Sequence, residues 1–231
     1  MTNKPETQTA GSRAYHHGGL RQALIEATIQ LVEDVGADNV TVREAARRAG
    51  VSSGAPFRHF ATKKALMGAV AEDAMARLRA TIEAGLEACR SPDPFAQLIA
   101  VADAYVLWAV KYPTHYRVIG DRVLVDFYKS QALQRDNRWI SERMLALLTQ
   151  ARDAGALRPG DIAGLALQTR ALAYGLARMH VDDHFMEFGI SNEQAQAAMS
   201  AVLRDFIVSL AREPDVARRH LEAAGVLPAE V

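Results

Sequence analysis

The sequence has a single cysteine, Cys89, and only eight prolines among its 231 residues. One cysteine excludes a disulfide within the chain and suits a reducing compartment such as the cytoplasm. Cys89 is either inert packing, which is commoner for a lone helical cysteine, or a redox sensor. Because proline is scarce and Ala and Leu are abundant, the composition favours a helical protein.

Long apolar runs and a net charge are also missing. No stretch approaches the ~20 apolar residues of a membrane-spanning helix, and no secretory signal opens the chain. We therefore expect a cytoplasmic protein with no membrane partner. Lys and Arg balance Asp and Glu at 27 each, but residues 1–64 carry a balance of +3 and the remainder −3. Nucleic acid, if it binds, should meet the N-terminal part.

The stretch from Thr41 to Leu66 predicts two short helices joined by a tight turn. Thr41 and Glu44 have the spacing of a capping box, so Thr41 should be the N-cap of the first helix. Gly50 stands where the chain must adopt a left-handed conformation. Ser53 is the favoured N-cap of the second helix, and Pro56 should lie in its first turn. This pattern indicates a helix-turn-helix.

Two lysines, Lys63 and Lys64, open the next predicted helix. Cations at a helix N-terminus oppose the helix dipole by a few tenths to ~1 kcal/mol. The arrangement makes sense if a phosphate docks on the open amides and the lysines, whereas two solvated lysines in a turn are the alternative.

The same stretch resembles the DNA-binding signature of the tetracycline-repressor (TetR) family of transcriptional regulators. The residues that carry the resemblance are Thr41, Ala45, Ala46, Ala49, Gly50, Val51, Ser52, Gly54, Phe57, His59, Phe60, Lys63 and Leu66. The segment Tyr15–Arg21, which reads Tyr-His-His-Gly-Gly-Leu-Arg, is similar to the arm of one subgroup of that family.

The resemblance implies roles for individual residues. Arg43 is the best candidate for a base contact, because arginine reads guanine bidentately. Thr41 and Lys63 should hold phosphates. The recognition helix should be presented by Ser53, Gly54 and Ala55 and flanked by Arg58 and His59. The family usually has Tyr where this chain has Phe57, so Phe57 keeps a packing role and loses the phosphate contact of the phenol.

Helical patterns continue through the rest of the chain, and no cofactor motif appears. The expected helices are 20–35, 62–88, 95–111, 114–128 (interrupted near Gly120), 132–154, 161–180, 191–212 and 214–224. The fold class is therefore all-α, with an N-terminal three-helix bundle and a larger C-terminal helical domain. The predicted domains are a disordered arm (1–14), the helix-turn-helix (15–64), a connector helix (65–90) and an effector-binding and dimerisation domain (91–231).

The connector prediction rests on apolar residues that recur every four positions from Leu66 to Leu86. Because that step overshoots a helical turn by about 40°, the stripe winds around the helix and can contact two bodies.

Aromatic residues gather between Phe95 and Trp139. In the family the corresponding region encloses an effector pocket, whereas an ordinary core would have the same composition. The residues expected to line such a pocket are Tyr105, Trp108, Tyr116, Phe127 and Trp139.

Helices 161–180 and 191–212 are rich in small residues. By analogy with the family they should form a four-helix homodimer interface, although packing within one chain explains them equally. The residues expected at the interface are Ala171, Gly175, Ala198 and Ala201.

A function of a different class rests on His180 and His184. Their spacing of four could place a metal on one helical face of a metal-dependent hydrolase, but a glutamate base is absent. The favoured interpretation is a non-enzymatic, homodimeric repressor that binds a palindromic DNA operator and responds to an unknown small-molecule effector.

Overall fold

The computed structural model describes residues 17–121 and 123–228. The predicted disordered arm (1–14), together with Tyr15 and His16 of the arm motif, lies outside the described residues. The chain separates into two compact units, the first ending at Leu66 and the second beginning at Met67. The division falls within one long helix, α3 (Lys63–Ala88).

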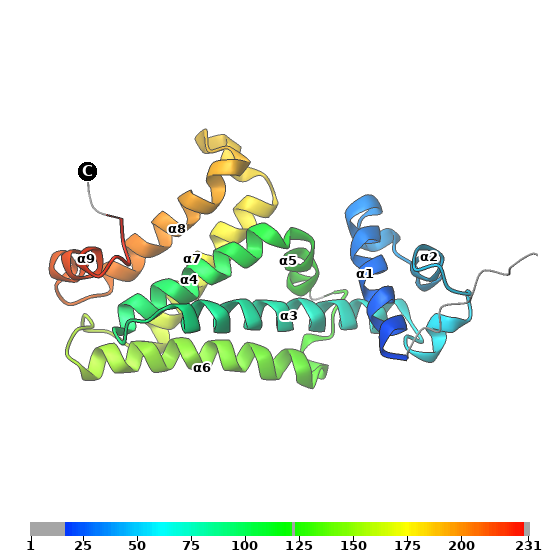
Figure 1. Ribbon diagram of the computed structural model, residues 1–231, viewed down its shortest axis with the longest axis horizontal. Coiled ribbons are helices and arrows are strands. Elements are labelled where there is room, and N and C mark those ends of the chain that lie inside the picture. The colour runs from blue at the N-terminus through cyan, green and yellow to red at the C-terminus, as the bar shows by residue number, and fades with distance from the viewer. Residues whose placement is uncertain (1–16, 122, 229–231) are drawn as a thin grey trace, which may run out of the picture. The chain divides into compact units, whose positions relative to one another are not determined.

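The described residues are mostly helical, as the composition predicts (Figure 1). In chain order the other helices are α1 (His17–Val35), η1 (Ala37–Asn39), α2 (Val42–Arg48), η2 (Ala55–Arg58), α4 (Pro94–Lys111), α5 (Pro113–Gly120), η3 (Phe127–Lys129), α6 (Gln131–Asp153), α7 (Ile162–Val181), η4 (His184–Phe188), α8 (Asn192–Ser209) and α9 (Pro214–Ala223). Extended pairing in this part of the chain is limited to one isolated bridge between Leu157 and Ala211.

The first unit is built on α1, which packs against α2. Leu24 and Ile25 of α1 and Ala45 and Ala46 of α2 are fully buried and form the core between the two helices. Thr41 caps α2 as predicted, because its Oγ1 accepts a hydrogen bond from the Glu44 N–H at 3.1 Å.

The turn after α2 depends on Gly50, whose φ of 69° is in the left-handed region as predicted. The second helix of the motif differs from the prediction, because it is a single 3₁₀ turn, η2. Gly54, not Ser53, is its N-cap, and no side chain caps it. Pro56, which has no backbone N–H and is buried, lies inside this short turn.

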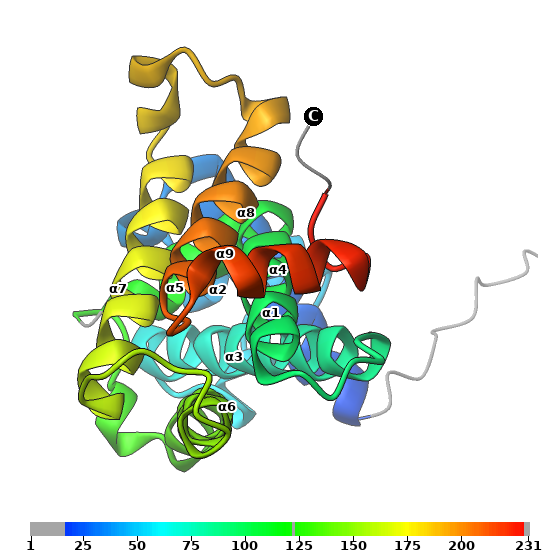
Figure 2. The ribbon, with the colours of Figure 1, turned by 90° about the vertical axis from the view of Figure 1, so that its left-hand side faces the viewer.

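The second unit is organised around α4, which packs on α6, α7 and α8. Asp93 caps α4, since its Oδ1 accepts from the Phe95 N–H at 2.7 Å, and Pro94 occupies the first turn. By length and composition α4 could span a membrane, but half of it is buried in the second unit and a core helix passes the same test. Figure 2 shows α7 and α8 running beside each other and joined at one end by η4.

The helix expected at 114–128 is shorter in the structure. α5 ends at Gly120, and the Asp121 carboxylate accepts hydrogen bonds from the N–H groups of Val123 and Leu124. This local turn competes with helical bonding and so ends the helix. Ser130 then caps α6 and donates to Glu72 of α3 at 2.7 Å.

The helices that form the predicted dimer surface begin where the sequence indicates. The Asp161 carboxylate accepts from the Gly164 N–H at the start of α7, and Ser191 and Gln194 form a capping box for α8. α8 ends at Ser209 rather than near Arg212. The reason is that the Arg212 N–H bonds to the Ala156 carbonyl, at 2.7 Å, instead of a helical partner.

Candidate functional site

The arginines of the helix-turn-helix in the first unit differ in their pairing. Arg47 forms an ion pair with Glu44, and Arg48 with Asp34 at 2.6 Å. Arg43 and Arg58 are exposed, and neither side chain forms an ion pair or hydrogen bond with a residue that the structure describes. These two arginines therefore keep their charge and their N–H donors available for a partner.

Thr41 and Lys63, the residues expected to hold phosphates, both have partners inside the unit. Thr41 caps α2, and the Lys63 Nζ donates to the Asp38 carbonyl at 2.6 Å. A lysine ammonium has three donors, so two remain. Thr62 caps α3 by accepting from the Ala65 N–H at 3.1 Å.

The segment expected to present the recognition helix is small and open. Ser53 and Gly54 are exposed, Ala55 is partly buried, and a Cβ added to Gly54 would meet no atom within 4 Å. His59 is partly buried beside the Phe60 ring. Phe57 is 47% exposed, so packing accounts for only about half of its surface.

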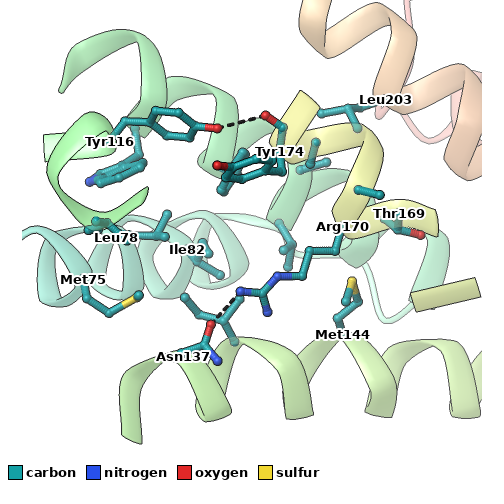
Figure 3. A pocket seen from close by; sticks show the side chains of 18 of the residues that line it. Met75, Leu78, Ile82, Tyr116, Asn137, Met144, Thr169, Arg170, Tyr174 and Leu203 are labelled. Atoms are coloured by element: carbon teal, nitrogen blue, oxygen red, sulfur yellow. Dashed lines mark hydrogen bonds between the residues drawn. The ribbon is translucent and has the colours of Figure 1, made fainter. Parts of the chain in front are cut away.

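The second unit contains a partly open cavity of about 400 Å³ (Figure 3). Helices α3, α4, α5, α6, α7 and α8 and the 3₁₀ turn η3 all contribute to its wall. The lining is mostly apolar, with Met75, Leu78 and Ile82 of α3 on one side and Met144 of α6 on another. A cavity of this size and composition fits a small organic molecule.

Aromatic rings form one end of the cavity. Trp108, which is 1% exposed, lies 6.3 Å from the ring of Tyr116, and Tyr116 lies 5.8 Å from the ring of Tyr174. The Tyr116 hydroxyl donates to the Tyr174 carbonyl at 2.9 Å. Burial raises the pKa of the Tyr105 phenol well above its usual range and does the same to Tyr116. Both phenols are therefore neutral near pH 7 and can take part in hydrogen bonds as intact hydroxyls.

Arg170 of α7 brings a charge to this apolar surface. Its Nη2 donates to the Asn137 Oδ1 at 2.6 Å and its Nη1 to the Ser141 Oγ at 2.9 Å. Figure 3 shows the side chain reaching from α7 toward Asn137 on α6. Arg170 and Asn137 both line the cavity.

The structure brings together most of the aromatic residues expected at a pocket. Tyr105, Trp108, Tyr116 and Phe127 line the cavity. Trp139 does not, because it lies on another face of α6, where its ring stacks with Arg79 and Arg143 and lines a separate hollow.

Sequence reasoning missed Arg170, Asn137 and Tyr174. Arg170 and Tyr174 lie among the small residues of α7 that suggested a dimer surface. The available signal was the helical spacing of Arg170 and Tyr174, four residues apart on one face.

The residues expected at a dimer interface lie on one surface of α7 and α8. Ala171 and Ala201 are exposed, Gly175 and Ala198 are partly exposed, and a Cβ added to Gly175 would meet nothing within 4 Å. Larger exposed apolar residues accompany them, namely Leu167, Tyr174 and Val202. An apolar surface of this kind is typical of a protein contact.

The alternative metal site requires His180 and His184 on one helical face. α7 ends at Val181, and Asp183 has a left-handed φ of 61°, so the chain turns between the two histidines. His184 instead pairs with Glu187 at 2.8 Å. The single-helix arrangement is therefore wrong, and residues 17–121 and 123–228 hold no group of three or more His, Cys, Asp or Glu suited to a metal.

Two family models match the two units of this helical, cavity-bearing protein. "Bacterial regulatory proteins, tetR family" matches residues 24–70, and "Tetracyclin repressor-like, C-terminal domain" matches residues 98–206. Together they cover well over half of the 231 residues. The chain belongs to the TetR family, whose members are transcriptional regulators and generally not enzymes.

Relatives agree with this assignment. The chain is 35% identical over 83 residues to the HTH-type transcriptional regulator BetI of Cronobacter sakazakii. The matched span is 36% of this chain and 41% of that protein. HTH-type transcriptional regulators BetI from Yersinia match over a similar span. The chain thus spans about two fifths of the length of these curated relatives.

Solved structures extend the likeness over most of the chain. A protein with unknown function from Rhodococcus sp. RHA1 has a TM-score of 0.69 at 28% identity and covers 87% of this chain and 100% of that one. The regulator KstR2 of Mycobacterium tuberculosis has a TM-score of 0.64 at 17% identity, with coverages of 87% and 99%. PfmR of Thermus thermophilus has a TM-score of 0.61 at 16% identity, with coverages of 80% and 96%. These last two show the shared fold.

Proposed function

We propose that the protein is a cytoplasmic, homodimeric transcriptional repressor that binds a palindromic DNA operator and releases it in response to a small-molecule effector. The observation that carries this proposal is that two exposed arginines of a helix-turn-helix, Arg43 and Arg58, have no carboxylate partner among the described residues. The role is one of binding rather than catalysis, and it requires no cofactor or metal.

DNA recognition divides between base and phosphate contacts. Arg43, in the first turn of α2, is proposed to read a guanine in the major groove. Thr41 and the two remaining donors of Lys63 are proposed to hold phosphates. The small residues Ser53, Gly54 and Ala55 would let the DNA approach the backbone of η2, with Phe57, Arg58 and His59 beside it.

The effector is proposed to bind in the cavity of the second unit, among Tyr105, Trp108, Tyr116 and Phe127. α3 supplies Met75, Leu78 and Ile82 to the cavity wall and continues without interruption into the first unit. A ligand that prefers one position of α3 would therefore change the population of DNA-binding conformations.

The dimer is proposed to form through α7 and α8, with Ala171, Gly175, Ala198 and Ala201 at the contact. Two recognition segments held by one dimer match the two halves of a palindrome, and this pairing supplies affinity that one short segment lacks.

The test is a selection of binding sequences from random duplex DNA by the full chain. We expect an inverted repeat bound by two chains, with the logarithm of affinity falling linearly as the logarithm of salt concentration rises. Sequence-independent binding, or a one-to-one complex on an asymmetric site, would contradict the proposal. For the variant Arg43→Ala, which removes one charge, Arg47→Ala is the charge-matched control, because Arg47 is already paired with Glu44.

A further inference from the structure

The cavity carries an uncompensated positive charge. Among the described residues that line it, Arg170 is the only one with a formal charge, and no Asp or Glu is present. Its two hydrogen bonds go to neutral oxygens, those of Asn137 and Ser141. Nothing in this arrangement neutralises the guanidinium.

Other arginines of the same unit are paired with carboxylates. Arg204 pairs with Asp103 at 2.7 Å, Arg79 with Asp136 at 3.1 Å, and Arg77 with Asp73. Among its described residues, the second unit therefore supplies counter-charges to several guanidinium groups but none to Arg170. A cation beside an apolar wall is stabilised when an anion joins it.

The donors of Arg170 are fixed and only partly used. A guanidinium has five N–H donors in a planar fork, and the hydrogen bonds to Asn137 and Ser141 use two of them. The Ser141 hydroxyl donates onward to the Asn137 carbonyl at 3.0 Å, so this group of α6 oxygens holds the fork in place. A planar carboxylate matches the remaining donors.

The charged and the aromatic residues of the cavity differ in their exposure to solvent. Arg170 is an exposed residue, whereas Trp108 is buried. The hydroxyls of Tyr105 and Tyr116 are hydrogen-bonded to each other, and Tyr116 also donates to the Tyr174 carbonyl. The donors of these two hydroxyls are thus engaged internally. The buried Trp108 Nε1, which also belongs to the cavity lining, has no partner among the described residues and is a donor left over at this end, where the rest of the ring surface is apolar. A ligand that fits has an apolar body inside and one charged head at Arg170.

We propose that the cavity binds an apolar monocarboxylate, with its carboxylate on Arg170 and its body among the aromatic rings. This inference rests on the proposed function, since it specifies the ligand of the same cavity. A cationic ligand would be repelled by Arg170 and would find no carboxylate in the described lining. A polyanion or a sugar would leave many polar groups without partners.

The test is isothermal titration calorimetry of the full chain with two acids and their neutral amides, octanoate with octanamide and 2-naphthoate with 2-naphthamide. At least one acid should bind about tenfold or more tightly than its amide, because only the acid forms a charge-assisted pair with Arg170. The pair that binds better distinguishes an alkyl body from an aromatic one.

Variants assign the preference to one side chain. Arg170→Gln should abolish the preference for acid over amide while leaving amide binding unchanged. Arg170→Lys should retain part of it, because lysine keeps the charge but lacks the planar fork. Arg143→Gln removes a cation that lies over Trp139, outside the cavity, and should bind as the wild type does. Circular dichroism of each variant verifies that the helices are intact.

Three results would overturn the inference: equal binding of acids and amides, an unchanged preference in Arg170→Gln, or no binding of any of the four compounds. Operator binding by the same wild-type preparation, measured without ligand, separates this inference from the proposed function. Intact operator binding with any of the three results rejects the ligand class alone, whereas absent operator binding rejects the regulator.

Discussion

At the scale of single residues, the pairing of each arginine separates structural from functional roles. Arg47 and Arg48 are held by Glu44 and Asp34, whereas Arg43 and Arg58 have no partner among the described residues. Because an exposed ion pair contributes little to stability, the paired arginines are replaceable at small cost. The two unpaired arginines add no ion pair to the stability of the fold, so any role they have is in binding a partner.

Arg43→Ala should cost ~1–3 kcal/mol of discrimination at one base pair in each half-site, since the variant loses a bidentate contact to guanine. The measurement is the affinity for a set of operators in which each position is varied in turn. Arg47→Ala should leave that pattern unchanged. Equal weakening of every operator by Arg43→Ala would identify Arg43 as a phosphate contact.

Phe57→Tyr should tighten operator binding. The ring is 47% exposed, so a hydroxyl can be added without entering the core, and the resemblance to the family implies that a tyrosine at this position contacts a phosphate. One net hydrogen bond is worth about 0.5–1.5 kcal/mol, or roughly two- to twelvefold in affinity for each half-site that the dimer contacts. Fluorescence anisotropy with labelled operator measures the change, and Phe57→Leu controls for the ring. Weaker binding by the tyrosine variant would mean that the ring does not face a phosphate.

At the scale of elements, two glycines of α3 meet different surroundings. A Cβ added to Gly85 would lie 2.9 Å from the Ala104 Cβ and 3.3 Å from the Ala100 carbonyl oxygen, whereas one added to Gly68 would meet nothing within 4 Å. Gly85 therefore lets α3 approach α4 closely, and Gly68 only weakens the helix.

Gly85→Ala should destabilise the protein by about 1–3 kcal/mol, because neither neighbour is the end of a flexible side chain and α3 must move. Gly68→Ala should stabilise it by about 0.5–1 kcal/mol through helix propensity alone. Urea unfolding followed by circular dichroism compares the two. The packing argument fails if both variants gain stability.

The element boundaries that could be predicted are those set by local chemistry. The side chains of Thr41 and Asp161 accept from backbone N–H groups three residues on, and the Ser191 N–H donates to the Gln194 side chain. Gly50 adopts the left-handed conformation that the turn demands. The end of α8 could not be predicted, because Arg212 bonds to Ala156, which is distant in sequence.

At the scale of the whole molecule, the cavity shows what sequence patterns cannot supply. Aromatic content pointed to Tyr105, Trp108 and Tyr116, which line one cavity, but could not separate them from Trp139, which faces Arg79 on another side of α6. Arg170 was missed because its partners, Asn137 and Ser141, lie about thirty residues away on another helix. Composition therefore indicates that the chain has an aromatic cavity, whereas tertiary packing determines which residues line it.

The proposed dimer is tested by Gly175→Leu. Nothing lies within 4 Å of an added Cβ at Gly175, and leucine is a better helix former than glycine, so the single chain should fold at least as well. At an interface of small residues, however, the leucine would separate the two copies of α7. We expect a monomer by light scattering with unchanged helical content. Operator affinity should fall by about 10²–10⁴, because the two recognition segments are no longer linked.

Ala146→Leu is the matched control, because Ala146 is exposed on α6, outside the surface formed by α7 and α8. It adds a leucine at an exposed helical position, and it should remain dimeric and bind the operator normally. A Gly175→Leu protein that stays dimeric and binds as the wild type does would show that α7 is not the interface. A monomer with wild-type operator affinity would contradict the bivalent mechanism itself, since one short recognition segment would then suffice.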